Sequence, residues 1–375
     1  MSSTAPVRIA GAGPAGLVAA ITLARAGREV ELFERRTVCG ARFGGDLQGL
    51  ENWSSDEDVL DEFRAAGLAI DFHAAPFSGG IQSDGARDDR FAFSRPAFYL
   101  VKRGDVDGSL DRALARQAAA AGVHIRYATA CPPGTADIDA SGPRGRAPFA
   151  IDAGIVFETD APDQAIALLN TRAAPRGYAY LLVTEGYGCC CTMLYEHFPS
   201  IHARLAHAHE LLLARRGITV RDPRPVGGLG HVRARGTWTS GDARCVGEAA
   251  GLQDFLWGFG IRLAVQSGVL AARAILEGRD YASAAAARFA PVLRRGVVNR
   301  WLWELGRGAD FFPVRAALRT IGPERVLRAL HRDAWWSDAI APLAHRALAS
   351  RYPGVFADPG PKALWKATAP LAPTA

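Results

Sequence analysis

Two glycine-rich turns, more than two hundred residues apart, place the strongest constraint on how this chain of 375 residues can fold. The first turn, Gly11–Gly16, follows a short apolar strand at 7–10 and opens a helix predicted over 17–26. Gly27 ends that helix as a left-handed cap, and a second strand follows at 29–33. This order of strand, glycine turn, helix and strand predicts a βαβ unit that binds a dinucleotide.

Each residue type in the first turn has a physical role in such a unit. Gly11 permits the tight turn, Gly13 lets the backbone approach a pyrophosphate, and Gly16 lets the helix pack on the strand. The helix N-terminus offers N–H groups to the phosphates. Glu34, eighteen residues after Gly16, is placed to bind the adenosine ribose, and Arg35 either contacts adenine or ends a solvated loop. The residues predicted to bind here are Gly11, Gly13, Pro14, Ala15, Gly16, Glu34 and Arg35.

The second segment repeats the arrangement of strand, glycine turn and helix. A strand at 242–246 enters a turn at 247–251, and a second turn at 258–261 opens a long amphipathic helix over 261–276. Because the fold then closes on the other end of the dinucleotide, the pair of turns favours a flavin over nicotinamide alone. Glu248 would reach a ribityl hydroxyl or the pyrophosphate, and the backbone of the second turn would reach the polar edge of an isoalloxazine. The residues predicted to bind here are Gly247, Glu248, Gly258, Phe259, Gly260 and Ile261.

In these motifs the chain resembles the FAD-dependent oxidoreductases of the geranylgeranyl reductase-like group, which have the glutathione-reductase-type FAD fold and are related to the aromatic-ring flavin hydroxylases. That group shows a Gly-Asp-Ala-Ala-Gly turn, an Asp-Pro pair and a Gly-Glu-Gly-Ile turn. Four positions depart from it: Glu248 replaces the Asp, Phe255 the Pro, Trp257 a small polar residue and Phe259 the acidic residue. The resemblance covers residues 7–55, 98–145 and 240–278 and implies FAD as the cofactor.

The resemblance also implies cofactor contacts outside the two turns. Arg103, which precedes a helix at 109–118, would lie over the ribityl chain or a phosphate. Gly142, at the end of a strand-and-glycine segment, would lie close to the adenosine. In the loop after the ribose carboxylate, Arg42 would contact the pyrophosphate and Cys39 would lie near the isoalloxazine, the alternative being an ordinary glycine-rich loop.

The predicted fold class is α/β, a Rossmann-type FAD domain with an inserted antiparallel β-sheet substrate domain and a C-terminal helical region. Two-residue alternation predicts strands at 149–159, 177–183 and 189–195, with a helix at 201–215 covering the sheet. We expect the FAD domain at 1–75, 98–145 and 226–285, the substrate domain at 76–97 and 146–225, and the helical region and tail at 286–375.

Three successive cysteines at 189–191 lie close to several histidines, but they do not predict a metal site. On a strand, Cys190 faces away from Cys189 and Cys191, so three adjacent ligands cannot converge. The chain has no Cys-x-x-Cys spacing. Buried small side chains are the better interpretation.

The C-terminal region mixes arginines with aromatic residues in predicted helices at 292–305, 312–321 and 324–336. Packing of a terminal helical subdomain is favoured. The alternatives are contact with a membrane surface and a roof over a lipophilic pocket. The tail after Tyr352 is expected to be loosely ordered.

Composition and charge narrow the class of protein. The net charge of +6 suits anionic ligands or an acidic membrane surface, but it is too scattered for nucleic acid. We find no signal peptide and no apolar run long enough to span a membrane, so at most a peripheral membrane contact is expected. Six irregularly spaced cysteines indicate reduced thiols, and we predict a cytoplasmic enzyme.

Three functions remain open from the sequence. The first is a flavin-dependent reductase or dehydrogenase of a lipophilic unsaturated, isoprenoid-like or aromatic small molecule, which the resemblance implies. The second is a flavin monooxygenase. Gly251 and Phe255 disfavour this function, because the aromatic hydroxylases have His and Pro at the corresponding positions. The third is an electron relay to a quinone.

No second G-x-G-x-x-G motif is present, so NAD(P)H is expected to act transiently, or a partner reductase or ferredoxin to supply electrons. No catalytic acid or base stands out. The residues expected in the substrate pocket are Trp53, Tyr180, Tyr195 and Trp257.

Overall fold

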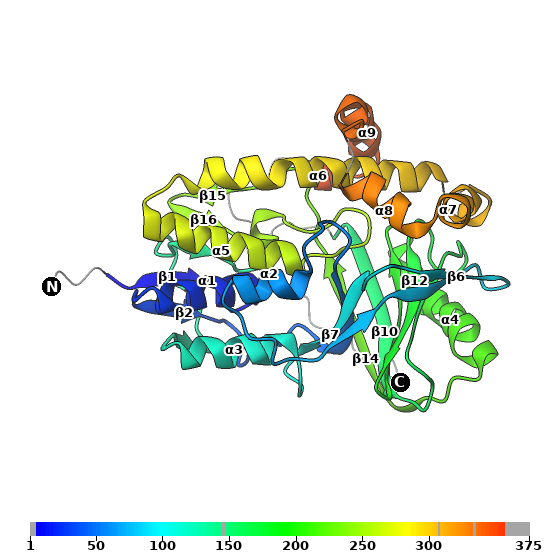
Figure 1. Ribbon diagram of the computed structural model, residues 1–375, viewed down its shortest axis with the longest axis horizontal. Coiled ribbons are helices and arrows are strands. Elements are labelled where there is room, and N and C mark those ends of the chain that lie inside the picture. The colour runs from blue at the N-terminus through cyan, green and yellow to red at the C-terminus, as the bar shows by residue number, and fades with distance from the viewer. Residues whose placement is uncertain (1–4, 144–147, 307, 333–334, 357–375) are drawn as a thin grey trace.

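The computed structural model describes residues 5–143, 148–306, 308–332 and 335–356 (Figure 1). A six-stranded sheet forms its dinucleotide-binding part. The strands, in sheet order, are β15 (Thr239–Ser240), β16 (Ala243–Cys245), β9 (Ile138–Asp139), β1 (Val7–Ala10), β2 (Val30–Phe33) and β8 (His124–Arg126). All neighbours pair in parallel except β15, which lies antiparallel at one edge. The sheet is therefore a Rossmann-type sheet assembled from distant parts of the chain.

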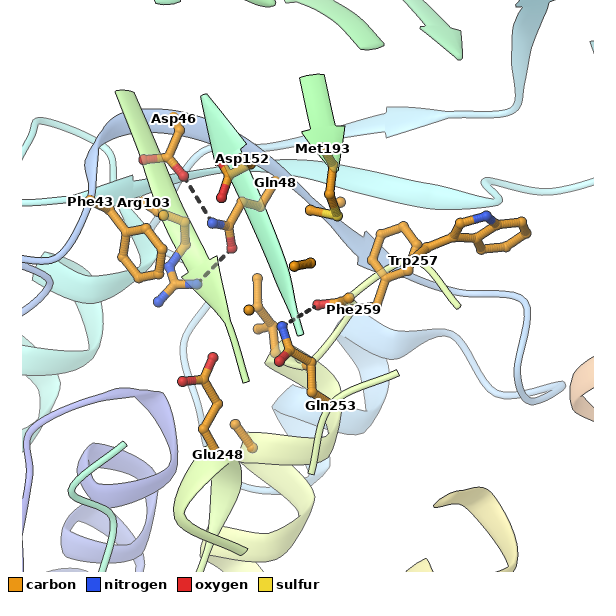
Figure 2. Close-up of a pocket in the computed structure, with 18 of the residues that line it drawn as sticks. Phe43, Asp46, Gln48, Arg103, Asp152, Met193, Glu248, Gln253, Trp257 and Phe259 are labelled. Carbon is orange, nitrogen blue, oxygen red and sulfur yellow. Dashed lines mark hydrogen bonds between the residues drawn. The ribbon is translucent and has the colours of Figure 1, made fainter. Parts of the chain in front are cut away.

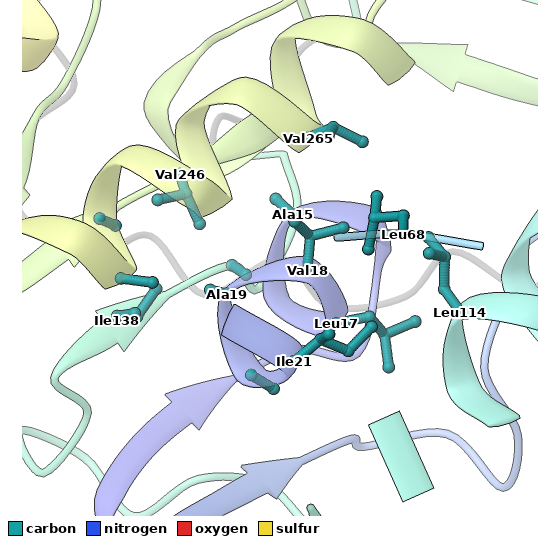
Figure 3. Packing of buried hydrophobic residues seen from close by; sticks show 14 of the residues in the cluster. Ala15, Leu17, Val18, Ala19, Ile21, Leu68, Leu114, Ile138, Val246 and Val265 are labelled. Carbon is teal, nitrogen blue, oxygen red and sulfur yellow. The ribbon is translucent and has the colours of Figure 1, made fainter. Parts of the chain in front are cut away.

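Three helices pack together beside this sheet. Helix α1 (Pro14–Arg25) lies between α5 (Ile261–Glu277) and α3 (Leu110–Ala120) (Figure 1). The approach of α5 to α1 is close, because a Cβ at Gly268 would stand 2.3 Å from the carbonyl oxygen of Ala15. A buried cluster of aliphatic side chains from α1, α5 and α3 fills the space between them (Figure 3). The second glycine segment thus completes the unit that the first one begins.

A seven-stranded sheet forms the second part of the fold. The strands, in sheet order, are β14 (Arg221–Gly230), β10 (Ala150–Glu158), β13 (Tyr187–Leu194), β12 (Tyr178–Thr184), β11 (Gln164–Leu168), β5 (Gly79–Ser83) and β6 (Asp88–Ala92). All pairs are antiparallel except β11 with β5. The antiparallel sheet predicted for 146–225 is present, and residues 79–92 join it. The domain boundaries stay a prediction, and β14 crosses the one placed at 225/226.

The two faces of the seven-stranded sheet have different partners. Helix α4 (Ile201–Leu212) packs on one face through a buried apolar cluster. A three-stranded sheet of β3 (Gly44–Glu51), β7 (Phe98–Gly104) and β4 (Ala74–Phe77) packs on the other face. Cys190 belongs to the α4 side, and Cys189 and Cys191 to the other side, as strand alternation predicts. Among the described residues, no group of histidines, cysteines and carboxylates could hold a metal.

The remaining helices lie mainly in the C-terminal region. They are α2 (Val59–Ala65), α6 (Tyr281–Gly306), α7 (Gly308–Ile321), α8 (Pro323–His331), α9 (Ser337–Arg351) and α10 (Pro353–Phe356), with short 3₁₀ turns at Phe198–Ser200, Ala214–Arg216 and Gly247–Ala250. The helices predicted at 292–305, 312–321 and 324–336 are present with different bounds. Helix α6 begins before 292 and continues through Pro291, α7 begins before 312, α8 ends at His331, and α9 was not expected. None of the described helices combines the length and apolarity that a membrane span needs.

A buried carboxylate fixes these helices to the seven-stranded sheet. Glu304 of α6 accepts hydrogen bonds from Arg176 at 2.8 Å, Arg300 at 3.1 Å and Tyr352 at 2.6 Å, and it also pairs with Arg351. Burial alone would raise the pKa of Glu304, but the arginines and the hydroxyl hold it below its ordinary value. The tail after Tyr352 was expected to be loosely ordered, but its first residues form α10; residues 357–375 lie outside the described residues.

Candidate active site

A cavity of about 2340 Å³ runs from the first glycine turn, past the second, to helices α7 and α8. Pockets for one small molecule usually measure roughly 300–1,000 Å³. The cavity is therefore large enough for a dinucleotide and a second molecule together.

The first end of the cavity is built around the N-terminus of α1. Gly13 is the N-cap residue, no side chain caps the helix, and a Cβ at this position would meet nothing within 4 Å. In contrast, the Ser109 hydroxyl caps α3 by accepting a hydrogen bond from the N–H of Arg112 at 3.2 Å. Gly11 has φ +100°, and its Cβ would lie 2.3 Å from the carbonyl oxygen of Ala140. The α1 dipole thus points into open space that a phosphate can occupy.

Glu34 stands at the carboxyl end of β2 and lines the same end of the cavity. Its carboxylate accepts hydrogen bonds from the N–H groups of Ala12 at 2.9 Å and Arg36 at 2.8 Å. These bonds fix the carboxylate beside the glycine turn. Arg35 is exposed and lines the cavity, as does Gly142, whose φ is +88°.

The two glycine segments meet in the middle of the cavity. Arg42 donates to Glu248 at 2.6 Å, and its second terminal nitrogen donates to the carbonyl of Leu229 at 2.7 Å. Gly247, which has φ +57°, donates its N–H to the Ser267 hydroxyl at 3.0 Å. Two residues predicted separately as cofactor ligands are therefore an ion pair at the cavity wall.

Arg103 of β7 is buried in the cavity wall. Its guanidinium pairs with Asp111 at 2.8 and 3.0 Å, donates to Gln48 at 2.8 Å, and lies 4.2 Å from the centre of the Phe43 ring. Burial alone would lower the pKa of Arg103, but Asp111 raises it. Gln48 in turn donates to Asp46 at 2.9 Å (Figure 2). Arg103 thus anchors a chain of side chains that reaches along β3.

The turn before α5 is held by Asp254. Its carboxylate accepts hydrogen bonds from the N–H groups of Leu256 at 3.1 Å and Trp257 at 2.6 Å, and burial raises its pKa to about 6. Gly258 follows with φ +81°, and Gly260 is the N-cap of α5, with no side chain capping the helix. A second uncapped helix N-terminus therefore borders the same cavity.

Aromatic side chains form the wall beyond this turn. The ring of Trp53 lies edge-on to those of Trp257, at 5.8 Å, and Phe259, at 5.0 Å. The Phe259 ring also fills the space above Gly49, where a Cβ would stand 2.6 Å from it. Tyr180 lines the cavity as well. Trp53, Tyr180 and Trp257, which the sequence analysis expected in the substrate pocket, thus line the cavity from three separate segments.

Three residues singled out from the sequence lie behind the cavity wall, not in its lining. Gly16 is packed against the first turn, since a Cβ would stand 2.0 Å from the carbonyl oxygen of Gly11. The Cys39 thiol lies 3.4 Å from the Tyr127 hydroxyl, and burial raises its pKa to about 11. Tyr195 is buried under the C-terminal helices, where its hydroxyl donates to the carbonyl of Leu256 at 3.1 Å.

The sequence reasoning missed several carboxylates that line the cavity. Asp111 and Asp139 are two of them, and Asp46 of β3 and Asp152 of β10 are two more (Figure 2). Burial raises the pKa of Asp152 to about 6. A signal was available for Asp152, because it is the one charged residue in the otherwise apolar stretch 148–157. The sequence also left open the roof over the cavity, which residues of α7 and α8 form, among them Val314, Leu318 and Leu327.

Comparison with known proteins places this arrangement in a known fold. A family model of the NAD(P)-binding Rossmann-like domain matches residues 9–46. No curated protein matches the chain.

Solved structures match almost the whole chain. A geranylgeranyl bacteriochlorophyll reductase-like protein from Thermoplasma acidophilum is 18% identical with a TM-score of 0.63, over 93% of this chain and 97% of that one. The flavin-dependent brominase Bmp2 is 16% identical with a TM-score of 0.63, over 92% and 99%. The 2-methyl-3-hydroxypyridine-5-carboxylic acid oxygenase is 18% identical with a TM-score of 0.55, over 88% and 97%.

These likenesses establish the fold. It is the fold of FAD-dependent oxidoreductases, a Rossmann-type domain joined to an antiparallel sheet and C-terminal helices. The fold class and the structural resemblance predicted from the sequence are confirmed.

Proposed function

We propose that the protein is an FAD-dependent oxidoreductase that reduces a lipophilic unsaturated small molecule. One observation carries the proposal, namely that two uncapped helix N-termini, those of α1 and α5, border a single cavity whose far end is apolar. The two helix N-termini suit a long anionic cofactor, and the apolar end suits a lipophilic substrate beside it.

The residues present fit FAD along the length of the cavity. The N–H groups at the start of α1 would bind the pyrophosphate and Glu34 the adenosine ribose. Arg42 would exchange part of its contact with Glu248 for a phosphate. The backbone from Gly258 to Ile261 would bind the polar edge of the isoalloxazine. The open space at Gly13, which any larger residue would narrow, supports this fit.

The far end of the cavity supports a lipophilic substrate. It lies under α7 and α8 and against the seven-stranded sheet. The side chains that line it are mainly apolar and include Leu169, Leu182, Leu302, Trp303, Val314, Leu318 and Leu327. Such a surface binds through burial of apolar area, at roughly 25 cal/mol per Å². We therefore favour an isoprenoid-like or extended aromatic compound.

Bound FAD would supply hydride transfer, and the chain supplies position and exclusion of water. The rings of Trp53, Trp257 and Phe259 pack edge-on against one another and line the cavity at the turn before α5, where they would orient the substrate beside the cofactor. The roof of α7 and α8 would keep water from the reacting atoms. NAD(P)H acting transiently, or a partner reductase, would supply the electrons.

The test begins with the visible spectrum of the protein purified with added FAD. Flavin bands that bleach with NADPH under anaerobic conditions support an enzyme that accepts electrons from nicotinamide, and bleaching only with dithionite supports a separate donor. The reduced protein is then mixed anaerobically with a panel of polyprenyl and aromatic alkenes. Reoxidation with formation of the saturated product supports the reductase.

Two outcomes contradict the proposal. A protein that binds no FAD refutes the cofactor. Product that forms only with oxygen and contains a new hydroxyl or halogen identifies a monooxygenase or halogenase in place of a reductase.

A further inference from the structure

Two carboxylates from different sheets face the cavity between its cofactor end and its apolar end. Asp46 lies on β3 and Asp152 on β10, and both line the cavity (Figure 2). Val156, four residues further along the same face of β10, belongs to one buried cluster with Leu47 of β3. The face of β10 that carries Asp152 is therefore turned toward the strand that carries Asp46.

Asp46 is fixed by its own strand. One carboxylate oxygen accepts a hydrogen bond from the N–H of Gly44 at 3.2 Å, and the other accepts one from Gln48 at 2.9 Å. Gln48 accepts from Arg103 at 2.8 Å in turn. Burial raises the pKa of Asp46 above its ordinary value, although these contacts oppose the shift. Its position beside the cavity is thus set before any substrate binds.

The surroundings of Asp152 favour its neutral form. Burial is the main cause that raises its pKa to about 6, and the negative charge of Asp46 adds to it. Arg42 and the N–H of Gly228 act in the opposite direction, but the Arg42 guanidinium is already paired with Glu248. Four further titratable groups interact with Asp152. They lie on β12, on β13 and directly after β13, and burial and neighbouring groups raise their pKa values, so they stay neutral: Tyr178, Tyr180, Cys191 and Tyr195.

Two other buried carboxylates are neutralised by ion pairs, whereas Asp254 is held by backbone N–H groups in the turn before α5. Asp111 pairs with Arg103, and Glu304 pairs with Arg176 and Arg300. Within the part of the chain that the structure describes, Asp152 takes part in no ion pair. An unpaired carboxyl group facing a cavity reduces stability, and such groups are concentrated at sites of proton transfer.

We propose that Asp152 donates the proton to the substrate reduced in this cavity, with Asp46 as the neighbouring charge that keeps the donor protonated. The inference rests on the proposed function. One carbon of the substrate double bond receives a hydride, with its electron pair, from reduced FAD. The other carbon receives the proton of Asp152. Two C–H bonds form and the π bond breaks, FAD is left oxidised, and the Asp152 carboxylate takes a new proton from water. NAD(P)H or the partner reductase restores the reduced cofactor.

The first part of the test needs neither FAD nor substrate. Infrared difference spectra of the unliganded protein follow the protonated carboxyl band over pH. Asp254, whose pKa burial also raises to about 6, contributes to this band in every variant, so the Asp152 component is the part that the wild type shows and Asp152→Asn lacks. We expect this component to titrate near pH 6, and to titrate at lower pH in Asp46→Asn because the neighbouring charge is gone. Asp160→Asn, which removes an exposed carboxylate paired with Arg221, is the matched control and leaves the band unchanged. An Asp152→Asn spectrum equal to that of the wild type, or an Asp152 component that does not move in Asp46→Asn, overturns the proposal.

The second part measures proton delivery in the FAD-loaded protein. Reduced wild-type protein is reoxidised by the polyprenyl alkene that it consumes fastest, and the rate falls as pH rises through about 6. Asp152→Asn is expected to slow this step by at least about a hundredfold and to abolish the pH dependence. Its FAD affinity stays within about twofold of the wild type.

The outcomes separate the two proposals. An unchanged rate in Asp152→Asn overturns the donor role. A loss of FAD affinity of about tenfold or more in Asp152→Asn assigns the carboxylate to cofactor binding and also overturns that role. Wild-type protein that binds FAD but reduces no alkene of the panel overturns the reductase, and with it proton delivery. The infrared titration still reports on the carboxyl pair in that case.

Discussion

Gly13 provides a direct test of where the cofactor lies, because the structure predicts that its replacement by alanine weakens FAD binding but leaves stability almost unchanged. Its φ of −79° and ψ of 175° suit alanine, and a Cβ would meet nothing within 4 Å. Replacing a favourable N-cap residue lowers the free energy of unfolding by roughly 0.5–1 kcal/mol. The smaller entropy of the unfolded chain, which follows from replacing glycine by alanine, raises it by about 0.4–1 kcal/mol. Gly13→Ala should therefore leave the stability of the unliganded protein within about 0.5 kcal/mol of the wild type.

The same methyl group would stand in the space that we assign to the pyrophosphate. If each lost or lengthened N–H contact to a phosphate costs about 1.5–3 kcal/mol, FAD affinity falls by about ten- to hundredfold. Quenching of flavin fluorescence on titration with FAD measures the affinity, and urea unfolding of the unliganded protein measures the stability.

Gly16→Ala is the matched control. Its Cβ would stand 2.0 Å from the backbone carbonyl of Gly11, so the turn itself must shift. Overpacking against backbone costs about 1–3 kcal/mol or more, which outweighs the gain of about 1 kcal/mol from replacing glycine by alanine in a helix. This variant should lose stability. Unchanged FAD affinity in Gly13→Ala would refute the placement of the pyrophosphate at α1, whatever Gly16→Ala does.

Three further predictions concern stability. The pKa of Asp152 is raised to about 6 in the folded state, so wild-type stability declines as pH rises from about 4, the ordinary pKa of an aspartate, to about 6. Relative to the wild type, Asp152→Asn should therefore gain about 1.5–3 kcal/mol on going from about pH 4 to pH 8, and an equal difference at both pH values in urea unfolding contradicts this. Glu304→Gln leaves buried arginines such as Arg300 without their counter-charge, and should lower the free energy of unfolding by about 3–5 kcal/mol. A loss below about 1 kcal/mol would contradict the role of Glu304 in fixing the C-terminal helices to the sheet. Gly268→Ala should lower the thermal midpoint by several degrees, since its Cβ would stand 2.3 Å from the Ala15 oxygen, and an unchanged midpoint contradicts the close helix contact.

The parts of the fold that the sequence predicted are those governed by local rules. The turn at Gly11–Gly16 requires glycines for reasons of backbone geometry, and these are visible in any window of a few residues. Strand alternation likewise placed Cys190 on the opposite face from Cys189, because side chains on a strand alternate with period two. Such rules need no knowledge of the rest of the chain.

The parts that were missed depend on tertiary neighbours. A proline at 291 usually marks a helix boundary, but α6 continues through it because its buried face packs on the rest of the protein. Asp152 acquires its raised pKa from burial in the assembled cavity and from Asp46, more than one hundred residues away in the chain. Tyr195 was expected beside the substrate, but its side chain lies in a cluster with Phe149 that the C-terminal helices cover. No window of the sequence contains these contacts.

The late position of α5 in the chain has a consequence for synthesis of the protein. The unit formed by β1, α1 and β2 is translated first, but α5, which packs on α1 through Gly268, ends only at Glu277. Until the ribosome has released that segment, one side of α1 exposes apolar surface, and the turn before α5 does not exist. The nascent chain therefore cannot retain the proposed cofactor, and its N-terminal unit is a candidate client for chaperones during translation.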